Sequence, residues 1–333
     1  MNKPVINLIF RKPAPQFNSI ENVFDALFPH IGKEFSVRRV YLPYRTRGLA
    51  SMRKNQKFIA RMKLEGISHV TGHENYIIRA LPGKKILTFH DIGSASVGKT
   101  FRDKYIQRNW FRIPLNLADR VTAISDFSFR EISSKYPGTA DKFRVIPNPV
   151  SDKIRYAASE FRREIPEILF VGTKKNKNLE RAVEALSGIP CRLTILGELS
   201  PVQQDLLDRS GIEFRNEVYL PYSEVLELYK FSDILLFPSL YEGFGMPILE
   251  AQATGRVVIT SNRGAMPFTA GEGALLVDPE NIGEIRTAVE KVIQDENTRK
   301  LLIEKGVENI QRFKADIIAA QYMEMYTELI HEA

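Results

Sequence analysis

The most constraining stretch of this chain spans residues 233–251. It begins with an apolar run of strand length, passes through a turn that contains Gly243 and Gly245, and continues with helix-forming residues that end at Gly255. A strand that leads through such a turn into a helix presents unpaired N–H groups and the positive end of the helix dipole. Glycines let the backbone approach a ligand closely. The stretch therefore indicates an α/β fold and predicts an anion site at the turn.

Two carboxylates belong to this stretch. Glu242 lies on the turn, where it can face the reacting end of a ligand. Glu250 lies in the first turns of the predicted helix, where its carboxylate can accept two hydrogen bonds from a vicinal diol such as that of ribose. Taken alone, either residue could be an ordinary glutamate, one capping the helix and the other solvated.

The wider sequence context favours a functional interpretation. Residues 238–251 read Pro-Ser-Leu-Tyr-Glu-Gly-Phe-Gly-Met-Pro-Ile-Leu-Glu-Ala. This stretch resembles the signature of the retaining glycosyltransferases of the GT-B class called family 4, in which seven residues separate two glutamates. The resemblance implies that Glu242 lies at the donor sugar and that Glu250 binds the nucleotide ribose. It also implies that the donor diphosphate is held by the backbone of Gly243, Phe244, Gly245 and Met246.

The chain as a whole alternates strands and helices, which predicts parallel, doubly wound sheets. In the first half we expect strands at residues 4–10, 36–42, 67–71, 85–89 and 120–125, and helices at residues 20–28, 49–64 and 101–117 and after Ser125. The resemblance implies two Rossmann-like domains facing a central cleft, the GT-B fold. We expect an acceptor-side domain at residues 1–153, a nucleotide-sugar donor domain at 164–314, and a terminal helix at 315–333 that crosses back to the first domain.

A lysine-rich loop opens the second half. A strand at residues 168–173 is followed by Lys174, Lys175 and Lys177, directly before a helix at 179–186. Cations are unfavourable at a helix N-terminus, and a bound polyanion would offset their repulsion. The resemblance implies that Lys177 contacts the donor diphosphate and that Gly172 and Thr173 line the same site. Solvated surface lysines are the alternative. Further along, we expect a strand at residues 218–220 and a helix cap at Ser223.

His90 follows the strand at residues 85–89, and ligands of open α/β sheets bind at the carboxyl ends of strands. A lone histidine is more often structural than catalytic. An apolar strand that ends in His-Asp resembles the acceptor-side catalytic segment of the same family. The resemblance implies that His90 approaches the donor sugar.

A second motif lies directly after this segment. Residues 93–100 read Gly-Ser-Ala-Ser-Val-Gly-Lys-Thr, which matches the phosphate loop of NTPases, and Asp278 after an apolar run is a candidate magnesium ligand. The signature around Glu242 specifies many more positions, so the P-loop NTPase is the second interpretation. A nucleotide-sugar epimerase of the same architecture is a third.

Charge is distributed unevenly along the chain. Residues 1–150 contain 26 Lys and Arg against 11 Asp and Glu, a charge of +15, whereas the whole chain carries +7. Neither zinc-type Cys/His pairs nor aromatics interleaved with basic residues indicate nucleic-acid binding. An anionic acceptor or an anionic membrane is the better partner. Residues 49–64 could form a basic helix on lipid, with Leu49, Met52, Ile59 and Met62 on one side, or pack on the sheet with lysines in water.

The expected activity is retaining transfer of a hexose-type sugar from a UDP- or GDP-sugar to a hydroxyl of a glycan or lipid-linked acceptor, in bacterial polysaccharide or lipid-linked glycan assembly. No metal or other cofactor is expected, because no Asp-x-Asp occurs. The single cysteine, Cys191, excludes an intrachain disulfide and suits a reducing cytoplasm. No apolar run reaches membrane-spanning length. We expect a cytoplasmic protein, with peripheral contact at the inner face of the membrane as an open alternative.

Overall fold

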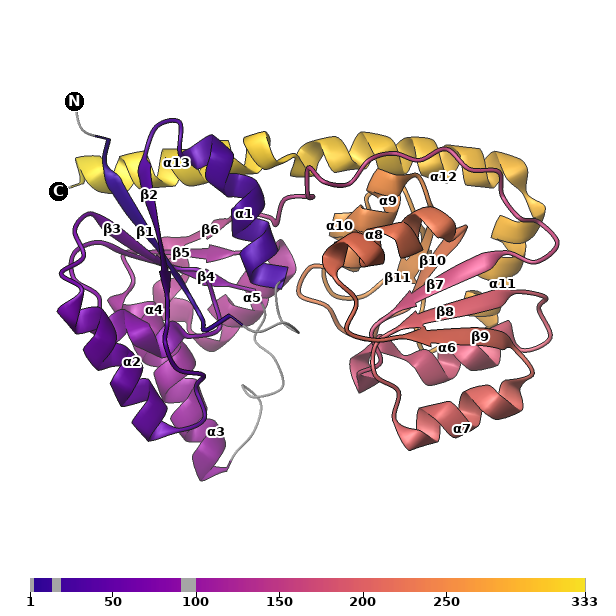
Figure 1. Cartoon of the computed structure of the whole chain (residues 1–333), viewed down its shortest axis with the longest axis horizontal. Coiled ribbons are helices and arrows are strands. Elements are labelled where there is room, and N and C mark those ends of the chain that lie inside the picture. The colour runs from indigo at the N-terminus through magenta and orange to yellow at the C-terminus, as the bar shows by residue number, and fades with distance from the viewer. Residues whose placement is uncertain (1–2, 14–18, 91–99, 333) are drawn as a thin grey trace. The chain divides into compact units, whose positions relative to one another are not determined.

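The computed structural model describes residues 3–13, 19–90 and 100–332. The chain forms two compact units (Figure 1). Unit 1 comprises Met1–Pro149 together with Ala315–Ala333, and unit 2 comprises Val150–Lys314. Among the helices described, none is both long and apolar enough to cross a lipid bilayer.

Unit 1 is built on a six-stranded parallel sheet with the strand order β2-β1-β3-β4-β5-β6. Its strands are β1 (Val5–Phe10), β2 (Ser36–Tyr41), β3 (Ile67–Val70), β4 (Lys85–Phe89), β5 (Arg120–Ala123) and β6 (Phe143–Val145). Its α-helices are α1 (Ser19–Ile31), α2 (Leu49–Arg61), α3 (Phe101–Ile106), α4 (Ile113–Leu117), α5 (Asp126–Lys135) and α13 (Ala315–His331). The alternation predicted for this half of the chain is confirmed, with boundaries that differ by a few residues.

Helices cover both faces of this sheet, as a parallel sheet requires. On one face, Ile6 and Leu8 of β1 pack with α1 and α13, which lie side by side (Figure 1). On the other face, Ile9 packs with residues of α2 and α4. A polar contact joins α13 to the sheet: the ring nitrogens of buried His69 lie 2.8 Å from the Tyr326 hydroxyl and 2.7 Å from the Thr88 hydroxyl. The last helix of the chain is therefore part of the core of unit 1.

The helix expected at residues 101–117 contains a π-helical segment, η3 (Gln107–Arg112), between α3 and α4. Pro114 has no N–H and cannot donate to the carbonyl of Trp110, four residues earlier. That carbonyl accepts a hydrogen bond from Asn75 Nδ2 instead, at 2.9 Å. A side chain distant in sequence thus satisfies the backbone group that the proline leaves unpaired, which the helical pattern alone does not reveal.

Helix α2 packs on the sheet through Met52, Asn55 and Ile59. Of the apolar residues expected on one side of this helix, Met52 and Ile59 are buried, whereas Leu49 is 53% exposed. Asn55 is buried because its side chain binds backbone: its Oδ1 accepts from Tyr44 N at 3.1 Å, and its Nδ2 donates to Tyr44 O at 2.9 Å. These bonds hold the loop before α2.

Unit 2 has a second six-stranded parallel sheet, with the order β12-β11-β10-β7-β8-β9. Its strands are β7 (Glu167–Val171), β8 (Arg192–Leu196), β9 (Glu213–Glu217), β10 (Ile234–Phe237), β11 (Val257–Ser261) and β12 (Leu275–Val277). Its α-helices are α6 (Leu179–Leu186), α7 (Pro201–Ser210), α8 (Tyr222–Phe231), α9 (Met246–Thr254), α10 (Met266–Ala270), α11 (Ile282–Gln294) and α12 (Glu296–Asn309).

Two local predictions for unit 2 are wrong. The strand expected at residues 218–220 is instead β9, at residues 213–217. Because β9 is an edge strand with few buried side chains, its sequence is polar and lacks the apolar signal of the central strands. Ser223 does not cap a helix: α8 begins one residue earlier, after Pro221, with no side-chain cap.

Candidate active site

Two neighbouring strands carry the polar cluster of unit 2. Strand β7 ends at Val171 and leads into the loop of residues 172–178, and β10 ends at Phe237 and leads into the loop of residues 238–245. These strands pair in parallel. Both loops therefore leave the same edge of the sheet, the edge at which α/β proteins bind ligands.

Two asparagines tie these loops together. Asn176 Nδ2 donates to Tyr241 O at 3.0 Å, and Leu240 N donates to Asn176 O at 2.7 Å. Asn178 Nδ2 donates to Pro238 O at 3.1 Å. Asn178 has φ +68°, a left-handed conformation that asparagine tolerates better than most residues. The sequence analysis predicted no role for these asparagines in joining the loops, although an Asn directly before a helix is a turn signal.

Lys177 and Glu242 meet where these loops touch. Lys177 Nζ lies 2.6 Å from Glu242 Oε1, and the two side chains are 18% and 15% exposed. The ammonium also lies 4.7 Å from the centroid of the Phe237 ring. A Cβ at Gly172, which has φ +90°, would lie 2.9 Å from Lys177 Cε. A side chain at this positive φ would be strained and would crowd Lys177 where it crosses the loop, so the structure gives Gly172 a steric role.

Helix α9 begins next to this ion pair. Gly245 directly precedes it at φ +99°, and a Cβ there would lie 3.0 Å from Ile248 Cδ1. The Phe244 side chain is 3% exposed and packs edge-on against Phe313, with ring centroids 5.8 Å apart. Any contribution of Phe244 to a ligand site is therefore confined to its backbone. Gly243 is also buried, and Met246 is half-buried at the first turn of the helix.

Glu250 is not a solvated helix residue. Its side chain is buried, and the Tyr222 hydroxyl donates a hydrogen bond to its Oε1 at 2.9 Å. Burial raises the pKa of this carboxyl, although hydrogen bonds to the carboxylate oppose the shift. The same burial raises the pKa of Tyr222, and the nearby Glu250 charge adds to the effect. The half-buried tyrosine and the buried carboxyl thus form a polar pair between α8 and α9.

In unit 1, His90 directly follows β4. Its Nε2 lies 2.7 Å from the Thr71 carbonyl oxygen, which can only accept, so Nε2 carries the proton. Burial lowers the pKa of His90 to about 4, against the hydrogen bond to Thr71, which raises it. The imidazole is therefore neutral near pH 7, and Nδ1 is its unprotonated nitrogen. The ring stacks on that of His73 with centroids 6.3 Å apart.

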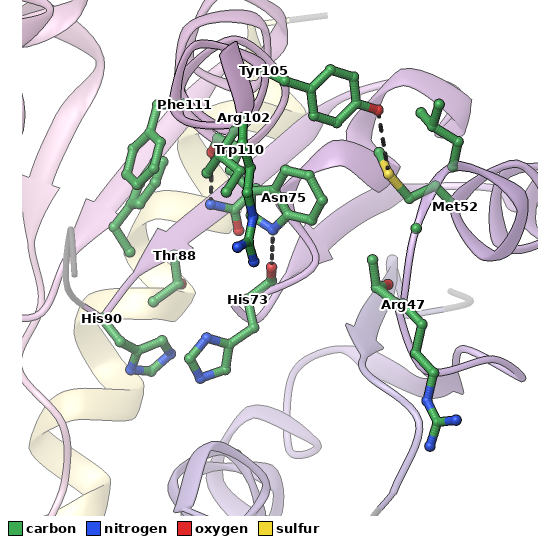
Figure 2. Close-up of a pocket in the computed structure, with 15 residues that line it drawn as sticks. Arg47, Met52, His73, Asn75, Thr88, His90, Arg102, Tyr105, Trp110 and Phe111 are labelled. Carbon is green, nitrogen blue, oxygen red and sulfur yellow. Dashed lines mark hydrogen bonds between the residues drawn. The ribbon is translucent and has the colours of Figure 1, made fainter. Parts of the chain in front are cut away.

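His90 also lines a pocket of about 800 Å³ within unit 1 (Figure 2). Arg47, Asn75, Arg102 and Trp110 are among the other residues of its wall. No motif indicated this pocket, because its residues come from segments that are far apart in the sequence. Thr173, the remaining predicted donor-site residue, lines a separate cavity of about 630 Å³ in unit 2.

The residues of the second interpretation do not form a site in the part of the chain that is described. Residues 93–99 of the phosphate-loop motif lie outside it. Asp278 forms an ion pair with Arg263 in unit 2, at 2.9 Å. Within residues 3–13, 19–90 and 100–332, no group of three or more His, Cys, Asp or Glu side chains is arranged to hold a metal ion.

Comparison with known proteins identifies the family. The model described as "Glycosyl transferases group 1" matches residues 154–309, and the model described as "Glycosyltransferase Family 4" matches residues 19–153. The chain belongs to the family 4 glycosyltransferases. It is thus a glycosyltransferase, as predicted, and neither an NTPase nor an epimerase is favoured.

Two relatives are mannosyltransferases, as their names state. The O-antigen chain mannosyltransferase B of Escherichia coli is 24% identical over 269 residues, which cover 73% of this chain and 70% of the relative. The serotype-specific mannosyltransferase WbdA of Escherichia coli is 23% identical over 305 residues, which cover 80% of this chain but 37% of WbdA. This chain therefore matches little more than a third of WbdA.

Solved structures share the fold over nearly the whole chain. Anabaena Alr3699/HepE in complex with UDP-glucose aligns with a TM-score of 0.77 and 16% identity, covering 97% of this chain and 99% of that one. Sucrose-phosphate synthase from Thermosynechococcus elongatus aligns with a TM-score of 0.75 and 18% identity, covering 99% and 100%. The predicted fold class, two Rossmann-like α/β domains of the GT-B type, is confirmed.

Proposed function

We propose that this family 4 glycosyltransferase transfers a hexose, with retention of configuration, from a UDP- or GDP-hexose to a hydroxyl of a glycan or lipid-linked acceptor. Its setting would be polysaccharide or lipopolysaccharide assembly, the setting that the mannosyltransferase names of its relatives suggest. One observation carries the proposal: Lys177 and Glu242 meet 2.6 Å apart beside the glycine turn that starts α9. A cation, a helix N-terminus and a carboxylate thus converge at one place.

The leaving nucleoside diphosphate sets the electrostatic demand of this reaction, because negative charge develops on it as the glycosidic bond breaks. Lys177 and the backbone N–H groups at the start of α9 would stabilise that charge, with the positive end of the helix dipole behind them. An ammonium group has three donors. Lys177 can therefore bind a phosphate oxygen while it keeps its hydrogen bond to Glu242. These groups would make a divalent metal unnecessary.

The remaining assignments follow from the chemistry of each side chain. Glu242 would orient the donor sugar through its hydroxyls and ease positive charge at the anomeric carbon. Glu250 would accept hydrogen bonds from the ribose diol, with its carboxylate held by Tyr222. His90, neutral and with Nδ1 unprotonated, would accept a hydrogen bond from a sugar hydroxyl.

A donor screen with product analysis tests the proposal. The purified protein is incubated with UDP-glucose, UDP-galactose, UDP-N-acetylglucosamine or GDP-mannose together with a glycan or lipid-linked acceptor, and release of nucleoside diphosphate is measured. NMR of the glycoside formed from an α-linked donor should show an α-linkage. A β-linked product would contradict retention. Conversion of the donor sugar to its epimer without an acceptor would contradict transfer.

We also propose that the protein is cytoplasmic and that unit 1 contacts anionic membrane peripherally. Helix α2 exposes Lys54, Lys57 and Arg61 next to Phe58, which is 36% exposed. Basic side chains around an exposed aromatic suit an anionic lipid surface. In flotation experiments, vesicles with phosphatidylglycerol should carry the protein upward and pure phosphatidylcholine vesicles should not. Equal recovery with both would remove this part of the proposal.

A further inference from the structure

The residues that line the pocket of unit 1 all belong to that unit. It is bounded by the start of α2, the segment around His73 and Asn75, and α3 with the π-helical segment that follows (Figure 2). Its volume of about 800 Å³ is in the range of small-molecule sites. Three features of the wall indicate which ligand it suits.

The first feature is a buried oxygen that lacks a donor. Asn75 is 4% exposed, and its Nδ2 donates to the Trp110 carbonyl at 2.9 Å. Because that carbonyl can only accept, the amide nitrogen must face it, and the oxygen is the atom left over. Within the described residues Asn75 Oδ1 has no hydrogen-bond partner. Buried polar atoms are nearly always paired, so this oxygen suits a ligand that donates, such as a sugar hydroxyl.

The second feature is positive charge. Arg47 precedes α2 and Arg102 lies in the first turn of α3, and both line the pocket with exposed side chains. In the described part of the chain, neither guanidinium forms an ion pair. Guanidinium groups present a planar fork of donors that matches a phosphate.

The loop that carries Arg47 is held in place before any ligand binds. The Thr46 hydroxyl donates to Glu74 Oε2 at 2.6 Å and lies 2.9 Å from the Tyr76 hydroxyl. Glu74 is thereby turned into this buried network, and burial raises its pKa. The Glu74 carboxylate is thus engaged by Thr46, and no ion pair with Arg47 occurs among the described residues.

The third feature is an aromatic wall. Trp110 lines the pocket, and its Nε1 donates to His73 O at 2.6 Å, which fixes the plane of the indole. Tyr105 lines the pocket on the same side, with its hydroxyl 3.5 Å from Met52 Sδ. Flat aromatic surfaces pack against the apolar face of a sugar ring and leave its hydroxyls for polar partners. Trp110 is the only tryptophan of the chain, so its fluorescence reports on this pocket.

We propose that the pocket binds an acceptor sugar that carries a phosphate or diphosphate group. The sugar ring would lie against Trp110 with one hydroxyl donating to Asn75 Oδ1, and the phosphate would bind Arg47 and Arg102. This inference rests on the proposed function, because it takes the bound sugar to be the acceptor. A neutral sugar would leave both arginines without a counter-charge.

Fluorescence titration tests the inference without any turnover. Glucose 1-phosphate, mannose 1-phosphate, glucose 6-phosphate, methyl glucoside and inorganic phosphate are each added to the full-length protein while Trp110 emission is recorded. At least one sugar phosphate should change the emission saturably, with a Kd at least about tenfold below those of methyl glucoside and inorganic phosphate. If methyl glucoside or inorganic phosphate binds as tightly as every sugar phosphate, the inference is wrong.

Matched variants locate the binding. Arg102→Gln and Arg47→Gln should each raise the Kd of the sugar phosphate about tenfold, whereas Lys104→Gln, an exposed cation of α3 outside the pocket wall, should not. Asn75→Ala should weaken the sugar phosphate but not inorganic phosphate. Because that substitution also removes the bond to Trp110, circular dichroism must show an intact fold for its result to count. Equal effects of the Arg102 and Lys104 variants would overturn the assignment.

Two further experiments identify the form of the ligand and test the proposed function separately. Vesicles that carry a polyprenyl phosphohexose distinguish a lipid-linked acceptor from a free sugar phosphate, and binding of either form supports the inference. Binding of neither form overturns it. Nucleoside diphosphate release from the donor without acceptor tests the proposed function separately. Donor turnover without sugar-phosphate binding refutes this inference alone, and sugar-phosphate binding without use of any nucleotide sugar refutes the proposed function.

Discussion

The carboxylates of the unit 2 site have protein partners, whereas the arginines of the unit 1 pocket form no ion pair among the described residues. In unit 2, Lys177 pairs with Glu242, and Tyr222 donates to Glu250. In unit 1, the oxygen of buried Asn75 has no partner among the described residues. In unit 2, the buried Ser239 Oγ likewise has no partner among the described residues, so the two sites differ in the pairing of their charged side chains. Under the proposals above, the unit 2 site is preorganised for the nucleoside diphosphate of the donor. In the unit 1 pocket, the ligand itself would neutralise the charge of the two arginines.

The two halves of the chain also differ in net charge. Residues 1–150 carry a formal charge of +15, and the rest of the chain carries −8. Residues 1–150 therefore carry an excess of positive charge that the rest of the chain lacks. The predictions below test this contrast, from the largest expected effect to the smallest.

Glu242→Gln should have the largest effect. We expect kcat to fall about a thousandfold, because the neutral amide cannot ease positive charge at the anomeric carbon. Binding of the nucleoside diphosphate should persist, since Lys177 and the start of α9 are unchanged. Steady-state turnover and calorimetric titration of the nucleotide measure the two effects. Glu304→Gln, at an exposed glutamate of α12, is the matched control. Unchanged turnover of the Glu242 variant would refute its assignment.

Lys177→Met should weaken nucleoside diphosphate binding by about 2–3 kcal/mol, as expected for the loss of a charge-assisted hydrogen bond. Titration calorimetry gives the affinity. The double variant Lys177→Met/Glu242→Gln should cost less affinity than the sum of the single changes, because the lysine variant leaves a half-buried carboxylate without its partner. Strict additivity would mean that the ion pair is irrelevant to nucleotide binding. Lys175→Met tests whether any lysine of the loop suffices.

Glu250→Gln should weaken nucleotide binding by about 1–2 kcal/mol, through the loss of charged hydrogen bonds to ribose. Tyr222→Phe keeps the carboxylate and removes the group that orients it, so we expect a smaller loss. Comparing a nucleoside diphosphate with its 2′-deoxy analogue isolates the ribose contact. If the Glu250 variant discriminates between the two analogues as strongly as the native protein, Glu250 does not bind the ribose.

Mild acid should destabilise unit 1 selectively. Burial lowers the pKa of His69 to about 3 and that of His90 to about 4, against 6.5 when exposed. The unfolded chain therefore binds more protons, and the stabilisation present above pH 6.5 is lost as the pH falls toward the folded values. Between pH 7 and pH 6 the loss is about 0.7 kcal/mol per histidine. Unit 2 contains no histidine.

Urea unfolding at the two pH values measures this effect. Tryptophan emission follows unit 1, which contains Trp110, and far-ultraviolet circular dichroism follows both units. The reactivity of buried Cys191 reports on the unfolding of unit 2. If its urea midpoint shifts with pH as much as that of Trp110 emission, the destabilisation is not confined to unit 1. His69→Gln should flatten the pH dependence by about half.

Much of unit 2 could be predicted because its signal is local. The strand, the glycine turn and the start of α9 are contiguous in sequence, and the parallel pairing of β7 with β10 brings the lysine loop to the same edge. Periodicity likewise predicted the buried strands of unit 1. It missed β9, whose edge position requires few apolar residues. The functional roles of the site residues stay predictions.

The pocket of unit 1 could not be predicted because its contacts are not local. Asn75 satisfies a carbonyl that Pro114 leaves unpaired, and the two residues are far apart in the sequence. Nothing in the periodicity of α3 and α4 reports such a bond. In the same way, Asn55 is buried on α2 because it binds the loop at Tyr44, where a hydrophobicity count expects an apolar residue. Hydrophobic periodicity cannot predict buried polar residues whose hydrogen-bond partners are backbone groups distant in the sequence.

The docking of α13 on α1 and the first sheet has a consequence for biosynthesis. The ribosome makes the strands of unit 1 first, yet the helix that carries Tyr326 follows the whole of unit 2 in the sequence. At translation rates of about 5–20 residues per second, the part of this face that α13 covers stays exposed for roughly ten to thirty seconds. During that interval the exposed apolar surface of nascent unit 1 can be bound by chaperones.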